Sequence, residues 1–130
     1  MNSQEYTDVW FRTYLPLEDI AAALDAPVRT ADGENYWEWV IADLAGIDID
    51  ITRTHTTAPE NTDTRIFRVG HPTGGREIPE HTLHQIVAGL QRAGVDPVYL
   101  GEWKYLDGNE FDHVVHKMIT WRAPHPDSDA

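Results

Sequence analysis

Apolar and polar residues alternate in several short stretches of the chain. The clearest stretch is Ile47-Asp48-Ile49-Asp50-Ile51, in which every second side chain is an isoleucine. A period of two is typical of a strand with one buried face. The pattern predicts strands at residues 9–15, 36–44, 47–51, 65–69, 98–105 and 111–121.

Two other segments carry apolar residues at helical spacing. In the first, Pro16 precedes an apolar stripe, and the helix is expected to end before Pro27. The second segment opens at Pro79 and Glu80, and Gly94 follows at the position of a left-handed helix cap. Its apolar stripe consists of Leu83, Ile86, Val87 and Leu90. Both segments are therefore predicted to be amphipathic helices that pack on a sheet.

Turn-forming residues separate these elements. We expect a turn at Asp32-Gly33, a polar loop over residues 54–64 and a hairpin turn at Asp107-Gly108-Asn109. The resulting order is β-α-β-β-β-α-β-β. This order predicts an α+β fold, a two-layer sandwich with a mainly antiparallel sheet and two helices on one face.

Large aromatic residues are more numerous on the predicted strands than two short helices could cover. They are Trp10, Tyr14, Trp37, Trp39, Tyr99, Trp103 and Tyr105. If the helices share one face of the sheet, some of these rings must lie on the other face. The sequence therefore predicts a second, partly open aromatic surface.

Composition adds a strong charge bias to this picture. The 130 residues contain 22 acidic and 10 basic side chains, which gives a net charge of −12. Such a chain repels phosphate backbones and anionic lipids, so we expect no direct nucleic-acid or membrane binding and favour a basic partner. We expect a single domain over residues 1–130, with flexible tails at residues 1–6 and 123–130. With no signal-like or membrane-spanning segment, we expect it to be cytoplasmic.

The acid excess is concentrated in residues 32–50, where no basic residue occurs. Aromatic anchors surrounded by carboxylates suit the recognition of a basic protein surface, because rings supply contact area and acids steer association. The candidate partner-binding residues here are Trp37, Glu38, Trp39, Asp48 and Asp50. The alternative is that Asp48 and Asp50 are the solvated face of an ordinary strand.

A second acidic and aromatic cluster surrounds the predicted hairpin near the C-terminus. Its candidate residues are Glu102, Trp103, Tyr105, Asp107 and Glu110. The alternative is a ladder of cross-strand aromatic pairs that fixes the strand register.

No catalytic or cofactor motif is complete in this sequence. There is no cysteine, and serine occurs only at Ser3 and Ser128 in the predicted tails. His81 and His84 share a helical face, but zinc sites need three or four ligands, so we expect no metal and no cofactor. The sequence thus favours a non-enzymatic role. The alternative is a small-molecule-binding or catalytic pocket on the open aromatic face, with polar contacts from Arg53, His55 and His116.

In size, acidity, element order and absence of catalytic motifs, the chain resembles the small bacterial immunity proteins that neutralise toxin domains. The resemblance rests on residues 32–50 and the hairpin at residues 102–112. It implies a protein-binding inhibitor whose partner is a basic protein, such as a toxin domain. Other readings remain open, namely a nucleic-acid-mimic inhibitor and a self-associating structural module that could form a homodimer.

Overall fold

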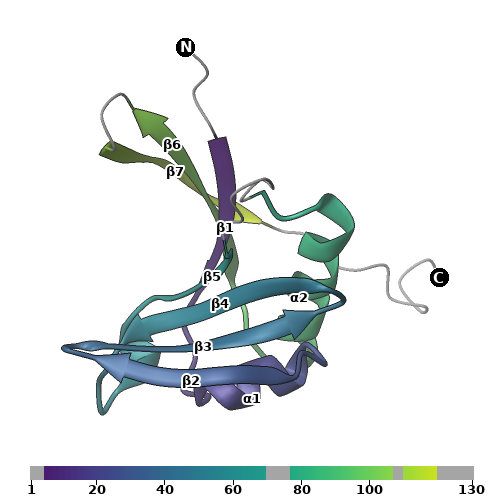
Figure 1. Ribbon diagram of the computed structural model, residues 1–130, viewed down its shortest axis with the longest axis vertical. Helices are drawn as coiled ribbons and strands as arrows, with labels where there is room; N and C mark the ends of the chain where they lie inside the picture. Colours follow the sequence, from purple (N-terminus) through teal and green to yellow (C-terminus); the bar gives the residue numbers. More distant parts are fainter. Residues whose placement is uncertain (1–4, 70–76, 107–109, 120–130) are drawn as a thin grey trace.

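The computed structural model describes residues 5–69, 77–106 and 110–119, with side chains for residues 8–69 and 77–101. Within these residues, seven strands form one antiparallel sheet in the order β2-β3-β4-β5-β1-β6-β7, and two helices accompany it (Figure 1). The elements are β1 (Glu5–Phe11), α1 (Leu17–Ala23), β2 (Val28–Glu34), β3 (Trp37–Leu44), β4 (Ile47–Thr54), the short helix η1 (Pro59–Asn61), β5 (Thr64–Arg68), α2 (Glu80–Arg92), β6 (Val98–Leu106) and β7 (Glu110–Ile119). The predicted α+β class is confirmed. Among the described residues, no helix has the length and apolar character needed to cross a bilayer.

Alternate side chains of the sheet and the apolar stripes of both helices form the core. One row of cross-strand neighbours on the helix side contains Ala31, Val40, Ile51, Ile66, Val9 and Leu100. Val9, Ile51 and Ile66 are fully buried, as are Ile20 of α1 and Ile86 of α2. Both helices therefore lie on the same face of the sheet, as the sequence predicts, and the two-layer arrangement follows from burying their stripes together.

β2 is a strand that the sequence pattern did not predict. It occupies one edge of the sheet, pairs with β3 alone among the described strands, and is exposed along its whole length. A strand with neither face buried shows no apolar alternation, so Asp32-Gly33 was expected to be a turn. The turn instead lies just beyond the strand, where Asn35 adopts φ 59°. Asparagine tolerates this left-handed conformation better than most residues do.

β1 also differs from the predicted strand at residues 9–15. It starts at Glu5, inside the predicted N-terminal tail, and ends at Phe11. Beyond it, the Thr13 hydroxyl accepts a hydrogen bond from the Leu15 backbone N–H at 3.2 Å, so this segment forms a local turn instead of continuing the ladder. In the sheet, β1 lies between β5 and β6, with Val9 opposite both Ile66 and Leu100.

The other face of the sheet carries no helix in the described part of the chain. A second row of cross-strand neighbours lies there: Asp32, Trp39, Thr52, Arg65, Trp10 and Tyr99. Trp39, Arg65, Trp10 and Tyr99 are each partly exposed. Because the helices occupy one face only, these side chains line a surface that solvent can reach.

Candidate functional site

An acid-lined hollow of about 550 Å³ lies between the start of α1, strands β2 and β3, and η1. Its lining includes three carboxylate residues, Glu18, Asp32 and Glu38, and the ring of Tyr14. Glu18 lies in the first turn of α1, where the helix dipole favours a carboxylate. The hollow therefore combines negative charge with an aromatic wall.

Arg53 is the base in this hollow, and its charge is already paired. Its side chain is about 6% exposed, its Nε donates to Glu38 Oε1 at 2.9 Å, and its Nη1 donates to the Leu15 carbonyl at 2.8 Å. A buried guanidinium needs such partners, because an unpaired buried charge is strongly destabilising. Arg53 thus ties β4 to β3 and to the segment before α1. Its pair with Glu38 leaves Glu18 as the uncompensated carboxylate on the helix side of the hollow. Asp32 lines the hollow from β2, but its side chain lies on the other face of the sheet, opposite Trp39.

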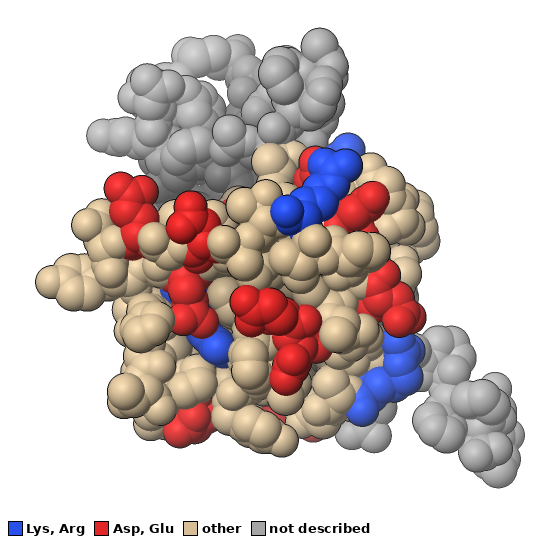
Figure 2. Space-filling model, turned by 60° about the horizontal axis from the view of Figure 1, so that its bottom comes forward, with Lys and Arg blue, Asp and Glu red and all other residues tan. Residues whose placement is uncertain are grey.

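The surface around this hollow is also acidic. Figure 2 shows it with the α1 and β2 side of the molecule turned forward, and carboxylate residues are spread across it. The exposed acids of α1, β2 and their connection are Glu18, Asp19, Asp25, Asp32 and Glu34. Within these elements the single basic residue is Arg29, which pairs with Asp48 of β4 at 3.2 Å. The potential over this side of the molecule is therefore negative.

Exposed aromatic side chains border the acidic surface. Tyr36 is 78% exposed and Trp37 is 50% exposed at the turn between β2 and β3, while Tyr14 is 74% exposed beside the hollow. Aromatic side chains this open to solvent have little role in the fold. They are typical of contact residues, because a ring offers a large area for a small loss of side-chain entropy.

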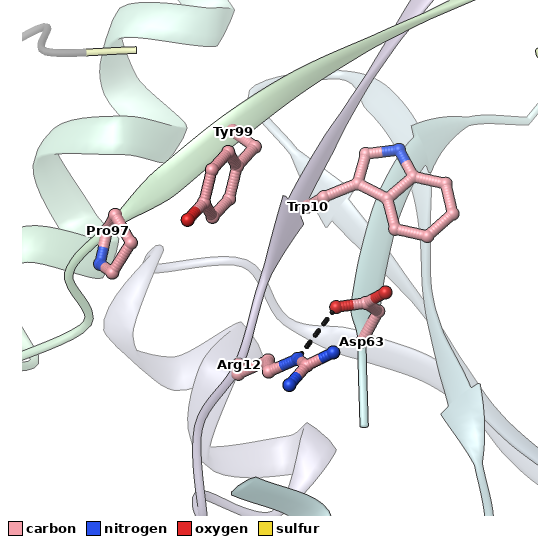
Figure 3. Close-up of a pocket in the computed structure, with 5 residues that line it drawn as sticks. All are labelled: Trp10, Arg12, Asp63, Pro97 and Tyr99. Atoms are coloured by element: carbon pink, nitrogen blue, oxygen red, sulfur yellow. Dashed lines mark hydrogen bonds and ion pairs between the residues drawn. The ribbon is translucent and has the colours of Figure 1, made fainter. Parts of the chain in front are cut away.

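Two further hollows lie on the uncovered sheet face. One of about 450 Å³ is lined by Trp10, Arg12, Asp63, Pro97 and Tyr99, with Arg12 Nε and Asp63 Oδ1 joined at 3.0 Å (Figure 3). The other, of about 290 Å³, lies towards β3. Its lining consists of Glu34, Asn35, Trp37, Trp39, Asp50, Thr52, Arg65 and Phe67. Figure 3 shows Arg12 and Asp63 together on one side of the first hollow, below the ring of Trp10.

Arg65 and Trp10 separate the two hollows. They are direct cross-strand partners, and the guanidinium carbon of Arg65 lies 5.1 Å from the Trp10 ring centroid and 5.3 Å from that of Phe67. This distance is within the range of a cation–π contact. The indole N–H of Trp10 donates to Asp8 Oδ1 at 2.7 Å, and Gly101 leaves room for this pair because a Cβ there would overlap both side chains.

Asp50 has an unusual environment for a carboxylate. Burial raises its pKa from 3.8 to about 6, although the nearby positive charge of Arg65 acts in the opposite direction. Its Oδ1 atom is buried and has no hydrogen-bond partner. A buried oxygen without a donor costs about 1 to 3 kcal/mol, so this carboxyl is held in an unfavourable state by the surrounding fold.

The structure brings together only part of the first predicted cluster. Trp37, Trp39, Asp48 and Asp50 lie on the uncovered sheet face, since alternate residues of β3 and β4 point there. Glu38 lies on the opposite face, in the acidic hollow. One stretch of sequence therefore contributes to two different surfaces.

The second predicted cluster falls largely outside the described side chains. Glu102, Trp103, Tyr105 and Glu110 are described by their backbone in β6 and β7, whereas Asp107 lies outside the described residues. Strands β4, β5 and β1 separate β6 from β3 in the sheet. The backbone arrangement thus does not place the second cluster next to the first.

The residues proposed for an alternative pocket are not collected on the aromatic face. Arg53 points to the helix side, and His55 is 72% exposed with its Nε2 3.9 Å from Glu38 Oε2. The backbone of His116 pairs with Gly101, and its side chain is outside the described set. The polar groups that do line the aromatic face are Asp50, Thr52 and Arg65.

Sequence reasoning did not select Glu18, Arg65 or Phe67 as site residues. β5 was predicted as a strand, but the pattern gave no sign that it lies between β4 and β1. Only this strand order brings Arg65 next to Thr52 and Trp10. Among the side chains that are described, no group of three or more potential metal ligands occurs.

Comparison with known proteins identifies no relative of this chain. No protein-family model, curated protein sequence or solved structure matches this chain. The class that the structure itself defines is a two-layer α+β protein with one sheet face that no described helix covers. Its acidic edge is the surface of α1, β2 and their connection, with the exposed acids Glu18, Asp19, Asp25, Asp32 and Glu34.

Proposed function

We propose that this protein is a non-enzymatic binding protein that engages a basic protein partner through its acidic edge. The observation that carries this proposal is the hollow lined by Glu18, Asp32 and Glu38, whose base, Arg53, is already neutralised. A lysine or arginine side chain of a partner fits such a hollow, because it meets the uncompensated carboxylate of Glu18 and the ring of Tyr14, with Asp32 on the adjoining edge strand.

The exposed rings beside the hollow supply the contact area that charge alone lacks. Rim charges mainly accelerate association, whereas aromatic anchors contribute most to the lifetime of a complex. Tyr36 and Trp37 are suitable anchors because both are exposed to solvent beside the acidic surface. We therefore assign steering to Glu18 and Asp32, and anchoring to Tyr14, Tyr36 and Trp37.

Within this proposal, the partner is a toxin domain with a basic surface, and the protein acts in the cytoplasm as an immunity-type inhibitor. The net charge of −12, the small size and the position of the acids over α1 and β2 support this assignment. Many toxin nucleases bind phosphate through basic clefts, and an acidic surface of this kind can block such a cleft.

The test uses a defined cationic probe. A fluorescent deca-arginine peptide is titrated with the wild-type protein and with the double variant Glu18→Lys/Asp32→Lys, and anisotropy is recorded from 20 to 300 mM NaCl. We expect the double variant to bind at least about tenfold more weakly at low salt, because two attractive charges become repulsive. The difference should shrink as salt screens the charges.

The matched control is Glu77→Lys/Glu80→Lys, which makes the same change in net charge at exposed positions near the start of α2. We expect this control to retain most of the affinity. Equal weakening of both double variants would show that the probe responds to net charge alone, and the proposed site would then be wrong.

A further inference from the structure

The hollow of about 290 Å³ on the uncovered sheet face has the composition of a ligand site. Three rings line it, those of Trp37, Trp39 and Phe67, together with the polar side chains of Asp50 and Arg65. Small-molecule sites are typically concave and apolar, with a few polar groups that fix the orientation of the ligand. This hollow lies on the other face of the sheet from the acidic hollow and shares Trp37 with the proposed partner-binding surface.

Asp50 supplies an acceptor that the fold itself does not use. Its Oδ1 atom is buried without a hydrogen-bond partner, although Asp50 lines the hollow. Buried polar atoms in native proteins nearly always have partners, so an exception at a cavity calls for an explanation. Rotation of the carboxyl group about χ2 turns this oxygen towards the hollow, where an N–H group of a ligand would satisfy it.

Arg65 supplies donors on the neighbouring strand. Its guanidinium carbon lies 5.3 Å from the Phe67 ring centroid, and Phe67 is the cross-strand partner of Asp50. Contact with Trp10 and Phe67 on both sides limits the orientations that the side chain can adopt. A guanidinium has five N–H donors, so it can serve a ligand carbonyl in addition to its other contacts.

The charges of the hollow disfavour an anionic ligand. The lining has two carboxylate residues, Glu34 and Asp50, and one base, Arg65, and together with the net charge of −12 they repel a phosphate. The rings favour a flat molecule, because aromatic stacking contributes about 1 to 3 kcal/mol per base in comparable sites. A neutral planar ring that carries an N–H donor beside a carbonyl acceptor matches the acceptor of Asp50 and the donors of Arg65.

We propose that this hollow binds a lactam-type nucleobase as a free nucleoside, with the ring against Trp39 and Phe67, a ring N–H donated to Asp50 and the adjacent carbonyl accepting from Arg65. Guanine, hypoxanthine and uracil have this donor and acceptor pattern. Adenine has no carbonyl group, so it leaves Arg65 without an acceptor. A site built on hydrogen bonds discriminates strongly against an analogue that lacks one of them.

The test is isothermal titration calorimetry with inosine, guanosine and adenosine as the three probes. We expect inosine and guanosine to bind with Kd below about 1 mM, and adenosine to bind at least about tenfold more weakly. Inosine monophosphate and a short oligo-inosine strand are titrated as well, to test whether the ligand is a free nucleoside, a nucleotide or a nucleic acid. The proposal requires both to bind more weakly than inosine, since each adds negative charge.

Variants connect the binding to the hollow. Asp50→Asn exchanges one acceptor oxygen for a donor and should weaken inosine binding at least about tenfold. The matched control is Asp48→Asn, two residues away on the same strand and face, which should change the Kd less than about twofold. Circular dichroism and urea unfolding confirm that both variants are folded.

Several results would overturn the proposal. They are the absence of heat with inosine at 5 mM, equal affinity for adenosine and inosine, equal weakening by Asp48→Asn and Asp50→Asn, and tighter binding of the phosphorylated probes. These outcomes are distinguishable from those of the deca-arginine experiment, because that experiment changes Glu18 and Asp32, which do not line this hollow.

Discussion

Glu38 and Asp50 are both acids of the predicted acidic and aromatic stretch, yet their surroundings give them different roles. Glu38 accepts from Arg53 at 2.9 Å, so its charge is used inside the fold. Asp50 has one buried oxygen without a partner, and burial raises its pKa to about 6. At the residue scale, the available partner decides whether a carboxylate stabilises the fold or is kept at a cost.

The raised pKa of Asp50 has a defined effect on stability. The folded state holds the Asp50 proton more tightly than the unfolded state, whose pKa is 3.8, so this residue lowers stability as pH rises from about 4 to 7. A shift of this size corresponds to about 3 kcal/mol at most, and solvent screening at this partly exposed side chain reduces it to about 1 to 2 kcal/mol.

We therefore predict that Asp50→Asn raises the free energy of unfolding at pH 7 by about 1 to 2 kcal/mol. The gain should diminish towards pH 4, where the folded-state carboxyl is protonated and the unfolded-state carboxyl, with a pKa of 3.8, is partly protonated as well. Urea unfolding of both proteins from pH 4 to pH 8 measures the difference in their free energies of unfolding. The contributions of all other carboxyl groups cancel in this difference. A gain that is independent of pH would contradict the assigned cause.

Alternation along β3 and β4 correctly indicated which residues of the acidic stretch share a face. It could not show which of those carboxylates would interact with a basic side chain, because Arg29 and Arg65 approach Asp48 and Asp50 from other strands. The face on which each residue of the site lies was thus predictable from the local sequence. The charge pairs of the site were not predictable, because they depend on the order of the strands in the sheet.

At the scale of elements, the two helices and the strands with one buried face were predictable because burial leaves an apolar period in the sequence. β2 was not predictable in this way, because it is exposed on both faces and shows no apolar period. The packing of α1 against α2 was also not evident from the pattern. Gly89 lies at this contact, where an added Cβ would come within 2.7 Å of Leu24 Cδ2 and 2.9 Å of the Ala23 carbonyl.

We predict that Gly89→Ala lowers the free energy of unfolding by about 1 to 2 kcal/mol. Alanine should favour the helix by about 1 kcal/mol, but overpacking a buried contact costs about 1 to 3 kcal/mol, and here backbone is one of the obstacles. Urea unfolding measures the change. As a control, Gln85→Ala at an exposed position of α2 should be neutral or slightly stabilising. A Gly89→Ala protein as stable as the wild type would show that overpacking costs no more than the roughly 1 kcal/mol that alanine gains in the helix, which contradicts the prediction.

At the scale of the whole molecule, a net charge of −12 opposes compaction. Exposed ion pairs such as Arg12–Asp63 and Arg29–Asp48 act in the opposite direction, but each contributes only about 0 to 1 kcal/mol. General repulsion among the acids should therefore exceed the sum of these local attractions.

We predict that raising NaCl from 10 to 200 mM at pH 7.5 increases the free energy of unfolding by about 1 kcal/mol, because screening weakens the repulsion. The Glu77→Lys/Glu80→Lys protein carries less negative charge and should show a smaller increase. Chemical denaturation with urea, which adds no ions, is the suitable measurement. A decrease with salt would mean that the surface ion pairs dominate after all.

The central position of β1 affects how the chain can be made. β1 precedes every other strand in the chain, but its neighbours in the sheet, β5 and β6, follow much later. During synthesis on the ribosome, Val9 and Phe11 must wait unpaired until these strands have emerged. Hairpins such as β3–β4 can form early, whereas the two halves of the sheet join only when β1 is enclosed. Completion of the sheet is therefore expected only after β6 has emerged, in one late step that depends on contacts distant in sequence.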